Sequence, residues 1–357
     1  MTIDIPAPNH GGNPLQLPDA EYYTEMLDLA TGINPWPWPV PCSCLAGLAK
    51  LPYHSSELQQ AAAKYYDVYP QQLLPTSGSQ AVIQLIPQML AVGRVLLAGP
   101  AYEEHAFRWQ QAGHECVFFP HDQPEKVAEL IRQQGIEYLV LVSPNNPTGQ
   151  MYTEAQLSQW QQLLPENGFM LVDQAYADVQ IESLCTGLLS KPKVMLLRST
   201  GKFFGLPGLR LGFALGDPQW LAKLDAMQGP WAVNSLAQSA GAVMLADRAW
   251  QHQMRQTLSA ASARQANMLG NILSGWVEST SSTPLFNSFE LPLDRGLLLQ
   301  QLCYKHGLSV RVYQWQGRAY MRWGLAADEA ELHRRLSSLG DELFALTDRV
   351  DSHVVHG

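Results

Sequence analysis

From Ser56 to Leu215 the sequence alternates between amphipathic helical stretches and short apolar runs, and this alternation constrains the fold more than any other feature. The helical pattern predicts helices at roughly 57–66, 79–90, 103–113, 126–134 and 153–164. The apolar runs predict strands at 94–98, 116–119, 138–142, 169–172, 194–197 and 211–215. Buried strands separated by helices form a mostly parallel sheet with helices on both faces, so we predict an α/β fold.

The flanking segments follow other patterns. Residues 1–49 are rich in proline and glycine, which predicts an extended arm because proline fixes φ and lacks a backbone donor. A long helical pattern runs from about Ser235 to Leu273, and strands then mix with helices. We therefore predict an arm at 1–49, a large domain at 50–235, and a linking helix with a smaller α+β domain at 236–357.

Composition disfavours several classes of function. The 357 residues carry a formal net charge of −9 with no block of Lys or Arg, which argues against nucleic acid or an anionic membrane as a partner. The longest apolar run, near 81–99, contains Pro87 and Arg94 and does not fit a membrane span, and the N-terminus shows no signal pattern. We therefore expect a cytoplasmic protein. Cys42 and Cys44 have no second pair or nearby histidine, so we expect reduced structural thiols and no metal site.

Polar residues follow three of the predicted strands. Asn146, Asp173 and Ser199 each come at or just after the end of a different apolar run, and Lys202 follows Ser199 closely. Ligands of open parallel sheets bind outside the carboxyl ends of the strands. We therefore predict that these segments bring an amide, a carboxylate, a hydroxyl and an amine to one edge of the sheet.

These groups suit an aldehyde cofactor with a pyridine ring and a phosphate, pyridoxal 5'-phosphate (PLP). The amine of Lys202 can form a Schiff base, which requires its neutral form and favours a site shielded from water. Asp173 can pair with the ring nitrogen, which makes the ring a better electron sink, while Asn146 and Tyr176 can contact the ring hydroxyl. Taken singly, each motif also fits a solvated lysine, a helix cap or a turn.

Three more features fit the same cofactor. The segment Thr76-Ser77-Gly78-Ser79 opens a predicted helix, where free N–H groups suit a phosphate. Arg210 supplies a forked, permanently charged donor for that phosphate. Tyr102, between a predicted strand and helix, can stack on the ring, although an aromatic residue there is also ordinary core.

In this order, Asn-Pro-Thr-Gly, Asp-x-x-Tyr, Ser-x-x-Lys and the later Arg resemble the PLP enzymes of the aspartate-aminotransferase fold (fold type I), and the matched features run from Tyr53 to Arg322. The resemblance implies that Lys202 carries the cofactor and that the homodimer's Tyr53 reaches the neighbouring subunit's cofactor phosphate. It also implies ring and phosphate contacts from Gly78, Ser79, Tyr102, Asn146, Asp173, Tyr176, Ser199 and Arg210. Gly201 departs from the family, which often has Ser or Thr there, so one phosphate hydroxyl is missing.

Within this fold the chain is similar to the branch of histidinol-phosphate aminotransferases and threonine-phosphate decarboxylases. Arg311 and Arg322 match the two C-terminal arginines of that branch, and His10-Gly11-Gly12-Asn13 and Ile33-Asn34-Pro35 are similar to the decarboxylase signature. Glycines there let backbone N–H groups approach an anion. The resemblance implies decarboxylation of L-threonine O-3-phosphate to (R)-1-aminopropan-2-yl phosphate in cobalamin biosynthesis, with the substrate bound by His10, Gly11, Asn34, Arg311 and Arg322.

Two alternatives stay open. A histidinol-phosphate or related aminotransferase would place the Cα–H bond, rather than the Cα–carboxylate bond, perpendicular to the ring, and substrate orientation decides between them. A non-catalytic PLP-fold binding or regulatory protein is less favoured, because Lys202 is present and we expect no DNA-binding extension before the fold.

Overall fold

The computed structural model describes residues 5–8, 11–12, 26–180 and 184–354, without the side chains of 347–354. The chain divides into two compact units. The large unit comprises Met1–Pro8 and Trp36–Gln256, and the small unit comprises Asn9–Pro35 and Thr257–Gly357. The N-terminal segment is therefore shared between the two units.

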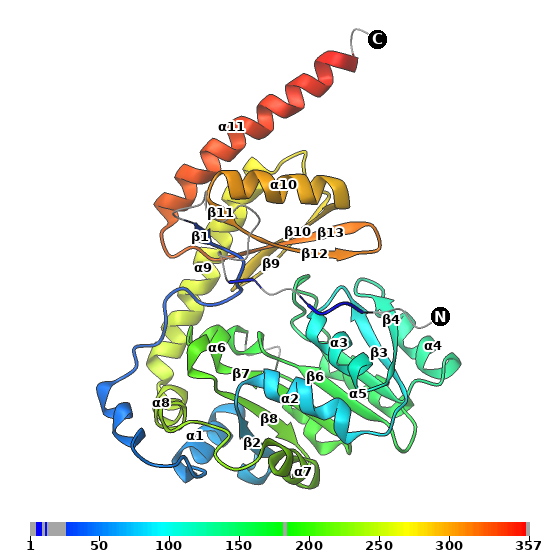
Figure 1. Cartoon of the computed structure of the whole chain (residues 1–357), viewed down its shortest axis with the longest axis vertical. Coiled ribbons are helices and arrows are strands. Elements are labelled where there is room, and N and C mark those ends of the chain that lie inside the picture. Colours follow the sequence, from blue (N-terminus) through cyan, green and yellow to red (C-terminus); the bar gives the residue numbers. More distant parts are fainter. Residues whose placement is uncertain (1–4, 9–10, 13–25, 181–183, 355–357) are drawn as a thin grey trace. The chain divides into compact units, whose positions relative to one another are not determined.

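The large unit is built on a seven-stranded sheet with the strand order β2-β8-β7-β6-β5-β3-β4 (Figure 1). Its strands are β2 (Leu73–Thr76), β3 (Arg94–Gly99), β4 (Glu115–Pro120), β5 (Tyr138–Val142), β6 (Phe169–Asp173), β7 (Val194–Ser199) and β8 (Gly212–Gly216). Strands β3 to β7 pair in parallel, and β8 is antiparallel to both neighbours. The predicted mostly parallel sheet is confirmed. Strand β2 was missed because its four residues include a proline and show no alternation.

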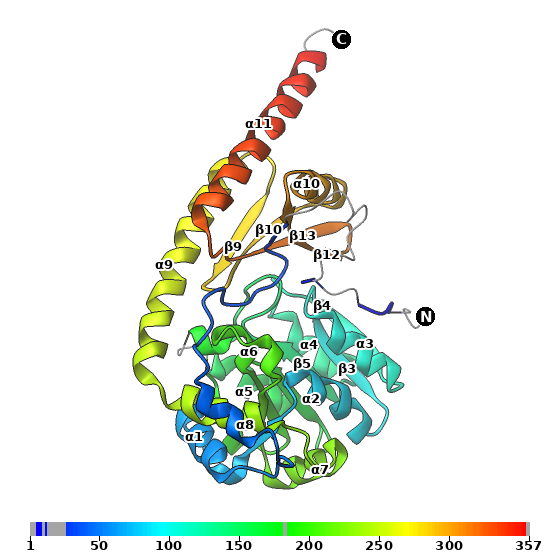
Figure 2. The ribbon, with the colours of Figure 1, turned by 60° about the vertical axis from the view of Figure 1, so that its left-hand side comes forward.

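The helices of this unit occupy the stretches between the strands. They are α1 (Ser56–Tyr66), α2 (Ser79–Leu85), α3 (Glu103–Gln111), α4 (Lys126–Gln133), α5 (Glu154–Leu163), α6 (Thr200–Phe203), α7 (Pro218–Gln228), α8 (Ser235–Ala246) and the first part of α9 (Arg248–Ile272). The single long helix predicted from Ser235 is wrong, because α8 ends before Asp247 (Figure 2). The Asp247 Oδ1 accepts a hydrogen bond from the Trp250 backbone N–H at 3.1 Å and so begins a new helix.

Packing shows which side chains share a face of this sheet. One face forms a core with α2 and α3 and includes Tyr138, Val140, Phe169, Leu171, Met195 and Leu197. Because strand side chains alternate between faces, Asp173 and Ser199 belong to this front face. Arg198 belongs to the opposite, back face, where its guanidinium carbon lies 4.8 Å from the ring centroid of Tyr66 in α1.

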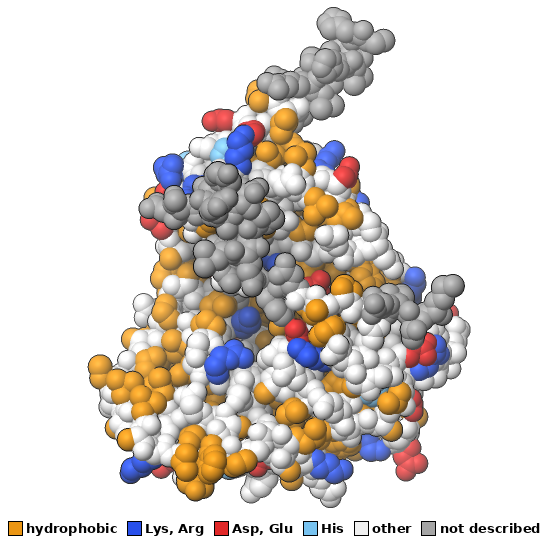
Figure 3. Space-filling model, viewed as in Figure 1, with side chains coloured by type: hydrophobic (Ala, Val, Ile, Leu, Met, Phe, Trp, Pro, Cys, Tyr) orange, Lys and Arg blue, Asp and Glu red, His pale blue; other side chains and the backbone are white. Residues whose placement is uncertain are grey.

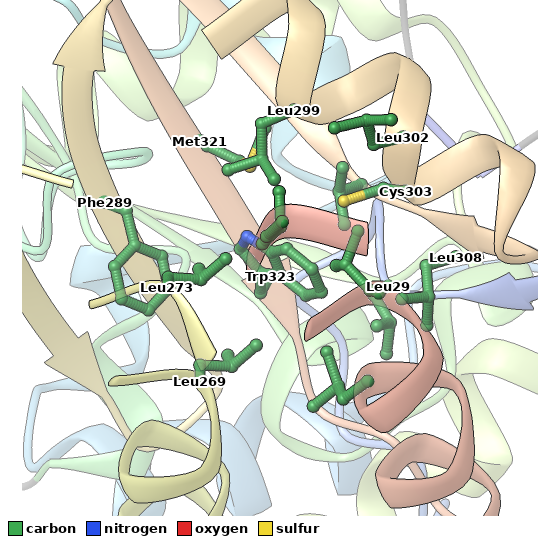
Figure 4. Close-up of a cluster of buried hydrophobic side chains, with 14 of the residues drawn as sticks. Leu29, Leu269, Leu273, Phe289, Leu299, Leu302, Cys303, Leu308, Met321 and Trp323 are labelled. Atoms are coloured by element: carbon green, nitrogen blue, oxygen red, sulfur yellow. The ribbon is translucent and has the colours of Figure 1, made fainter. Parts of the chain in front are cut away.

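The small unit contains a four-stranded antiparallel sheet in the order β12-β13-β10-β9. Its elements are β1 (Leu27–Asp28), β9 (Ser279–Thr283), β10 (Phe286–Pro292), α10 (Leu293–Lys305), β11 (Leu308–Ser309), β12 (Arg311–Trp315), β13 (Arg318–Gly324) and α11 (Glu329–Val354), with the rest of α9. Strand β1 pairs in parallel with β11 and joins the N-terminal segment to this unit. Trp323 is fully buried among Leu29, Leu273 and Leu299 (Figure 4).

The predicted extended arm is described only in part. Residues Cys42–Gly47 form a 3-10 helix, η3, which becomes possible because the proline-rich stretch ends at Pro41. No described helix is long and apolar enough to cross a membrane. The described residues also contain no group of three or more His, Cys, Asp or Glu side chains placed to hold a metal ion.

Candidate functional site

Asp173 ends β6 as a buried carboxylate with two direct partners. Its Oδ1 accepts a hydrogen bond from the Ala175 backbone N–H at 2.9 Å, and its Oδ2 lies 3.0 Å from Nε2 of His105 in α3. Both side chains are buried, so these bonds are needed to offset the cost of removing them from water. The sequence-based prediction missed His105. Its position one helical turn after Tyr102, on the same helix face, is the signal that could have indicated it.

Lys202 lies in α6, directly after β7. Its Nζ is 5.4 Å from the ring centroid of Tyr176, which is buried. Thr200 anchors this short helix, because its Oγ1 donates a hydrogen bond to the Leu211 carbonyl at 2.8 Å. The segments that follow β6 and β7 thus bring the predicted phenol and the predicted amine together.

The residues predicted to hold the phosphate also converge. Ser199 pairs with Gly212 between β7 and β8. A Cβ atom on Gly212 would stand 2.6 Å from the Ser79 backbone nitrogen, so only glycine lets these segments approach so closely. A Cβ atom on Gly78 would stand 2.9 Å from Nη2 of Arg210. Gly78 has φ +76° and Arg210 has φ +55°, so both adopt left-handed conformations beside each other.

Gly201 has a steric reason to depart from the family pattern. A Cβ atom at this position would stand 3.0 Å from the Cα of Pro207. Contacts this short are rare for real Cβ atoms, so a serine or threonine would require residue 207 to shift by a few tenths of an ångström. The close packing of residue 207 on α6 is thus matched by the absence of a side chain at position 201.

Asn146 and Tyr102 lie on the same side of the large unit as the Asp173–His105 pair. Asn146 is buried in the loop after β5, and the preceding Asn145 ties that loop to the Pro100 carbonyl through a 2.9 Å bond from Nδ2. The Tyr102 ring makes an edge contact with the His105 ring at a centroid distance of 6.1 Å. The loops after β3, β5 and β6 thus meet at one edge of the sheet.

Tyr53 lies away from these contacts on the surface of the large unit. Its side chain is 73% exposed, and its ring meets the edge of Trp231 at a centroid distance of 6.4 Å. Leu45, Leu48 and Leu51 are also exposed. Figure 3 shows hydrophobic side chains gathered at its lower left, over the segment that is blue at lower left in Figure 1.

The predicted substrate residues belong to the small unit. Arg311 and Arg322 lie directly opposite each other in the β12–β13 pair, so both side chains share one face of the sheet. Their guanidinium carbons are 5.0 and 5.7 Å from the ring centroid of Tyr313. Arg322 is buried and donates a hydrogen bond to the Ala30 carbonyl. Asn34 is buried and Gly11 is exposed, while His10 lies outside the described residues.

Known proteins match this chain over most of its length. Residues 49–324 match the family model described as aminotransferase class I and II. The chain is 38% identical to a threonine-phosphate decarboxylase of Pseudomonas aeruginosa, covering 86% of this chain and 88% of that relative. It is 32% identical to a threonine-phosphate decarboxylase of a Sinorhizobium species, covering 93% and 94%. The solved histidinol-phosphate aminotransferase of Sinorhizobium meliloti, in complex with pyridoxal-5'-phosphate, matches with a TM-score of 0.75 at 20% identity, covering 87% of this chain and 88% of that one.

The solved aminotransferases confirm the predicted aspartate-aminotransferase-like fold. The family match spans strand β6 with Asp173, helix α6 with Lys202, and the strands that carry the paired arginines. The chain therefore belongs to the aminotransferase class I and II family.

Proposed function

We propose that this protein is a PLP-dependent enzyme that decarboxylates L-threonine O-3-phosphate to (R)-1-aminopropan-2-yl phosphate. The observation that carries the substrate class is the register of Arg311 opposite Arg322. Two guanidinium groups on one face of neighbouring strands suit a ligand that carries both a carboxylate and a phosphate. Similarity to relatives named threonine-phosphate decarboxylase over most of the chain supports this reaction. The expected role in cobalamin biosynthesis and the cytoplasmic location stay predictions.

The large unit fits PLP. When bound, PLP supplies a protonated pyridine ring that accepts the electron pair left at Cα when a bond to that carbon breaks. Asp173 is the carboxylate to hold the ring nitrogen, and Lys202 is the amine to bond the aldehyde. The close approach of Gly78 and Arg210 supports a phosphate site there, because a glycine lets backbone N–H groups come close to an anion that lies beside the guanidinium. The remaining proposed contacts come from Ser79, Tyr102, Asn146, Tyr176 and Ser199.

The chain's own residues account for orientation and for proton movement. Arg311 and Arg322 would hold the carboxylate and the phosphate of the substrate, which fixes the rotation about the Cα–N bond. His105 keeps the Asp173 carboxylate in place through its 3.0 Å bond. Lys202, once released from the cofactor and protonated, would be the ammonium that gives a proton to Cα after CO2 leaves, and the neighbouring Tyr176 limits where its Nζ can point. Gly11, Asn34 and His10 are proposed as further substrate contacts.

Histidinol-phosphate aminotransferase activity is the second candidate. The structural match to the enzyme of Sinorhizobium meliloti supports it, and both substrates carry a phosphate group. The two activities differ in their need for an oxo acid, because transamination requires an acceptor for the amino group whereas decarboxylation does not.

We also propose a homodimer in which Tyr53 reaches the cofactor phosphate of the partner subunit. The segment that precedes Tyr53 exposes three further apolar side chains, Leu45, Leu48 and Leu51, and the Tyr53 ring contacts the exposed ring of Trp231. Clusters of exposed apolar side chains of this kind are typical of protein–protein interfaces.

Purified protein supplied with PLP is expected to release CO2 from phosphothreonine without any oxo acid, and to leave phosphoserine and histidinol phosphate unchanged. Lys202→Ala should lower kcat by about a thousandfold, because it removes the proposed proton donor and the covalent anchor of the cofactor. Mass spectrometry of products and borohydride trapping at Lys202 are the measurements. Turnover only with an oxo acid would favour the aminotransferase, and an unchanged biological role for Lys202→Ala would favour a binding protein.

His105→Phe is expected to raise the Kd for PLP about tenfold, because the buried Asp173 carboxylate loses a direct partner. His114→Phe is the matched control, since the His114 ring bonds the backbone of Pro87 and Gly93 instead. The control should lower the melting temperature without changing the Kd. Titration followed by the absorbance of bound PLP measures both, and equal Kd values for the two variants would contradict the role of His105.

Arg311→Gln is expected to raise KM for phosphothreonine at least tenfold while leaving the Kd for PLP unchanged, because a charged hydrogen bond to the substrate is lost. Arg318→Gln, on the neighbouring strand, is the control, since Arg318 pairs with Glu278 and Glu290. Steady-state kinetics with CO2 detection gives both constants. A KM that rises equally in both variants would count against a substrate contact.

Sedimentation velocity is expected to give twice the chain mass of 39.6 kDa. Leu48→Glu should shift the protein toward the monomer, because it places a charge in the proposed apolar interface. Tyr53→Phe should keep the dimer and weaken PLP binding by about fivefold through loss of one hydrogen bond. A monomer with full activity would refute the shared site.

A further inference from the structure

The back face of the large sheet holds an unusual pair of charged side chains next to Lys202's segment. Arg198, just before Ser199, is fully buried, and Asp178, two residues after Tyr176, is 2% exposed. Among the described residues, no hydrogen-bond partner lies within reach of the three guanidinium nitrogens of Arg198 or of either Asp178 carboxylate oxygen. The hydroxyl of Tyr66 is also buried and has no hydrogen-bond partner among the described residues.

Helices α1 and α9 enclose this pair. The Arg198 guanidinium lies over the Tyr66 ring at 4.8 Å. Arg255 of α9 donates from Nε to the Asp178 carbonyl at 2.9 Å and from Nη2 to the Tyr65 hydroxyl at 3.1 Å. We call Tyr65, Tyr66, Asp178, Arg198 and Arg255 the back-face cluster.

The cluster contacts both ends of the segment that carries the lysine. Arg198 precedes Ser199 in β7, and the Arg255 guanidinium carbon lies 4.9 Å from the ring centroid of Phe203, the residue after Lys202. Helix α6 has only four residues and cannot be stable by itself. Its position therefore depends on contacts with other elements, namely the hydrogen bond from Thr200 to the Leu211 carbonyl and the contact of the back-face cluster with Phe203.

Buried charges without hydrogen bonds are costly, and internal water is the usual way to satisfy them. The donors of Arg198, the oxygens of Asp178 and the hydroxyl of Tyr66 together supply the two to four polar partners that a buried water needs. We propose that Asp178 and Arg198 form a buried, water-bridged ion pair that fixes the Ser199–Lys202 segment from the back of the sheet. Asp178 is thus a positioning residue for Lys202. The link to catalysis rests on the proposed PLP function, whereas the ion pair itself does not.

Burial makes this pair sensitive to pH. It raises the pKa of the Asp178 carboxyl from 3.8 to about 6, although Arg198 and Arg255 each lower it. A carboxyl with a raised pKa binds more protons in the folded chain, so its effect on stability becomes less favourable as pH rises from about 4 to 6 and stays so above. Tyr65 and Tyr66 also face Asp178, and burial raises the pKa of both, so they remain neutral in this range.

Ionisation of Asp178 therefore does not add to the stability of the fold, and the positioning role rests on the contacts at both ends of the Ser199–Lys202 segment. Below about pH 6 the protonated Asp178 no longer balances the charge of Arg198. Because Arg198 lowers the pKa of Asp178, a protonated Asp178 favours an arrangement in which the Arg198 guanidinium has moved away toward other acceptors or water, and the end of β7 is then released.

Amide hydrogen exchange of PLP-free protein, followed by mass spectrometry on peptides covering 194–204, tests the proposal without the cofactor. After correction for intrinsic rates, wild-type protection of this segment should fall about tenfold between roughly pH 7.5 and pH 5. Asp178→Asn should show the low protection at both pH values, and Asp178→Glu should restore the pH dependence. Asp217→Asn is the matched control, because Asp217 caps α7 by accepting from the Gln219 N–H, which asparagine also does.

The same variants are titrated with PLP. Asp178→Asn should raise the Kd about tenfold at neutral pH, and Asp217→Asn should not. Wild-type protection and wild-type affinity in Asp178→Asn would overturn the proposal. If that variant fails to fold, Arg198→Lys replaces it, and unchanged protection in Arg198→Lys would overturn it too. If the wild-type protein binds no PLP but shows the pH-dependent protection, the proposed function is refuted while the ion pair is still supported.

Discussion

Adjacent residues of a strand point to opposite faces of a sheet. At the end of β7 this alternation places one residue at the proposed phosphate site and the preceding one in the back-face cluster. Ser199 belongs to the front face and pairs with Gly212 beside Gly78 and Ser79. Arg198 belongs to the back face and enters the back-face cluster. A slip of β7 by one residue would send the guanidinium to the front and the hydroxyl to the back. The register between β6, β7 and β8 is therefore the constraint on which the site depends.

The sheet could be predicted from the sequence because buried strands consist of apolar residues. Strands that are covered on both faces appear in the sequence as continuous apolar runs. The polar residues that follow these runs indicate where the strands end at the edge of the sheet. Asn146, Asp173 and Lys202 could be located in this way. The direction of a strand leaves no such record, so the antiparallel β8 and the short β2 could not be predicted from hydrophobicity.

The residues that were missed act through contacts between distant segments. His105 lies on an amphipathic helix where a histidine looks like ordinary core, and only the fold brings it to Asp173. Arg198 and Asp178 are both buried, and the residues next to them in the sequence do not indicate that the two side chains belong to one cluster. The steric demand on Gly201 depends on Pro207, whose approach follows from the turn after α6. The local sequence pattern thus located the polar residues at the edge of the sheet. The residues that hold them in place are determined by tertiary packing and could not be predicted.

Asp173 and Asp178 lie five residues apart in one connection, yet their surroundings differ in kind. Asp173 has direct hydrogen bonds to the Ala175 N–H and to His105, so its position is set by protein atoms alone. The Asp178 side chain has charge neighbours but no direct bond among the described residues, and burial raises its pKa. Tyr176 lies between them in the sequence, and its ring is next to the amine of Lys202. A proton taken up by Asp178 can therefore loosen the support behind Lys202 while the carboxylate of Asp173 keeps its own hydrogen bonds.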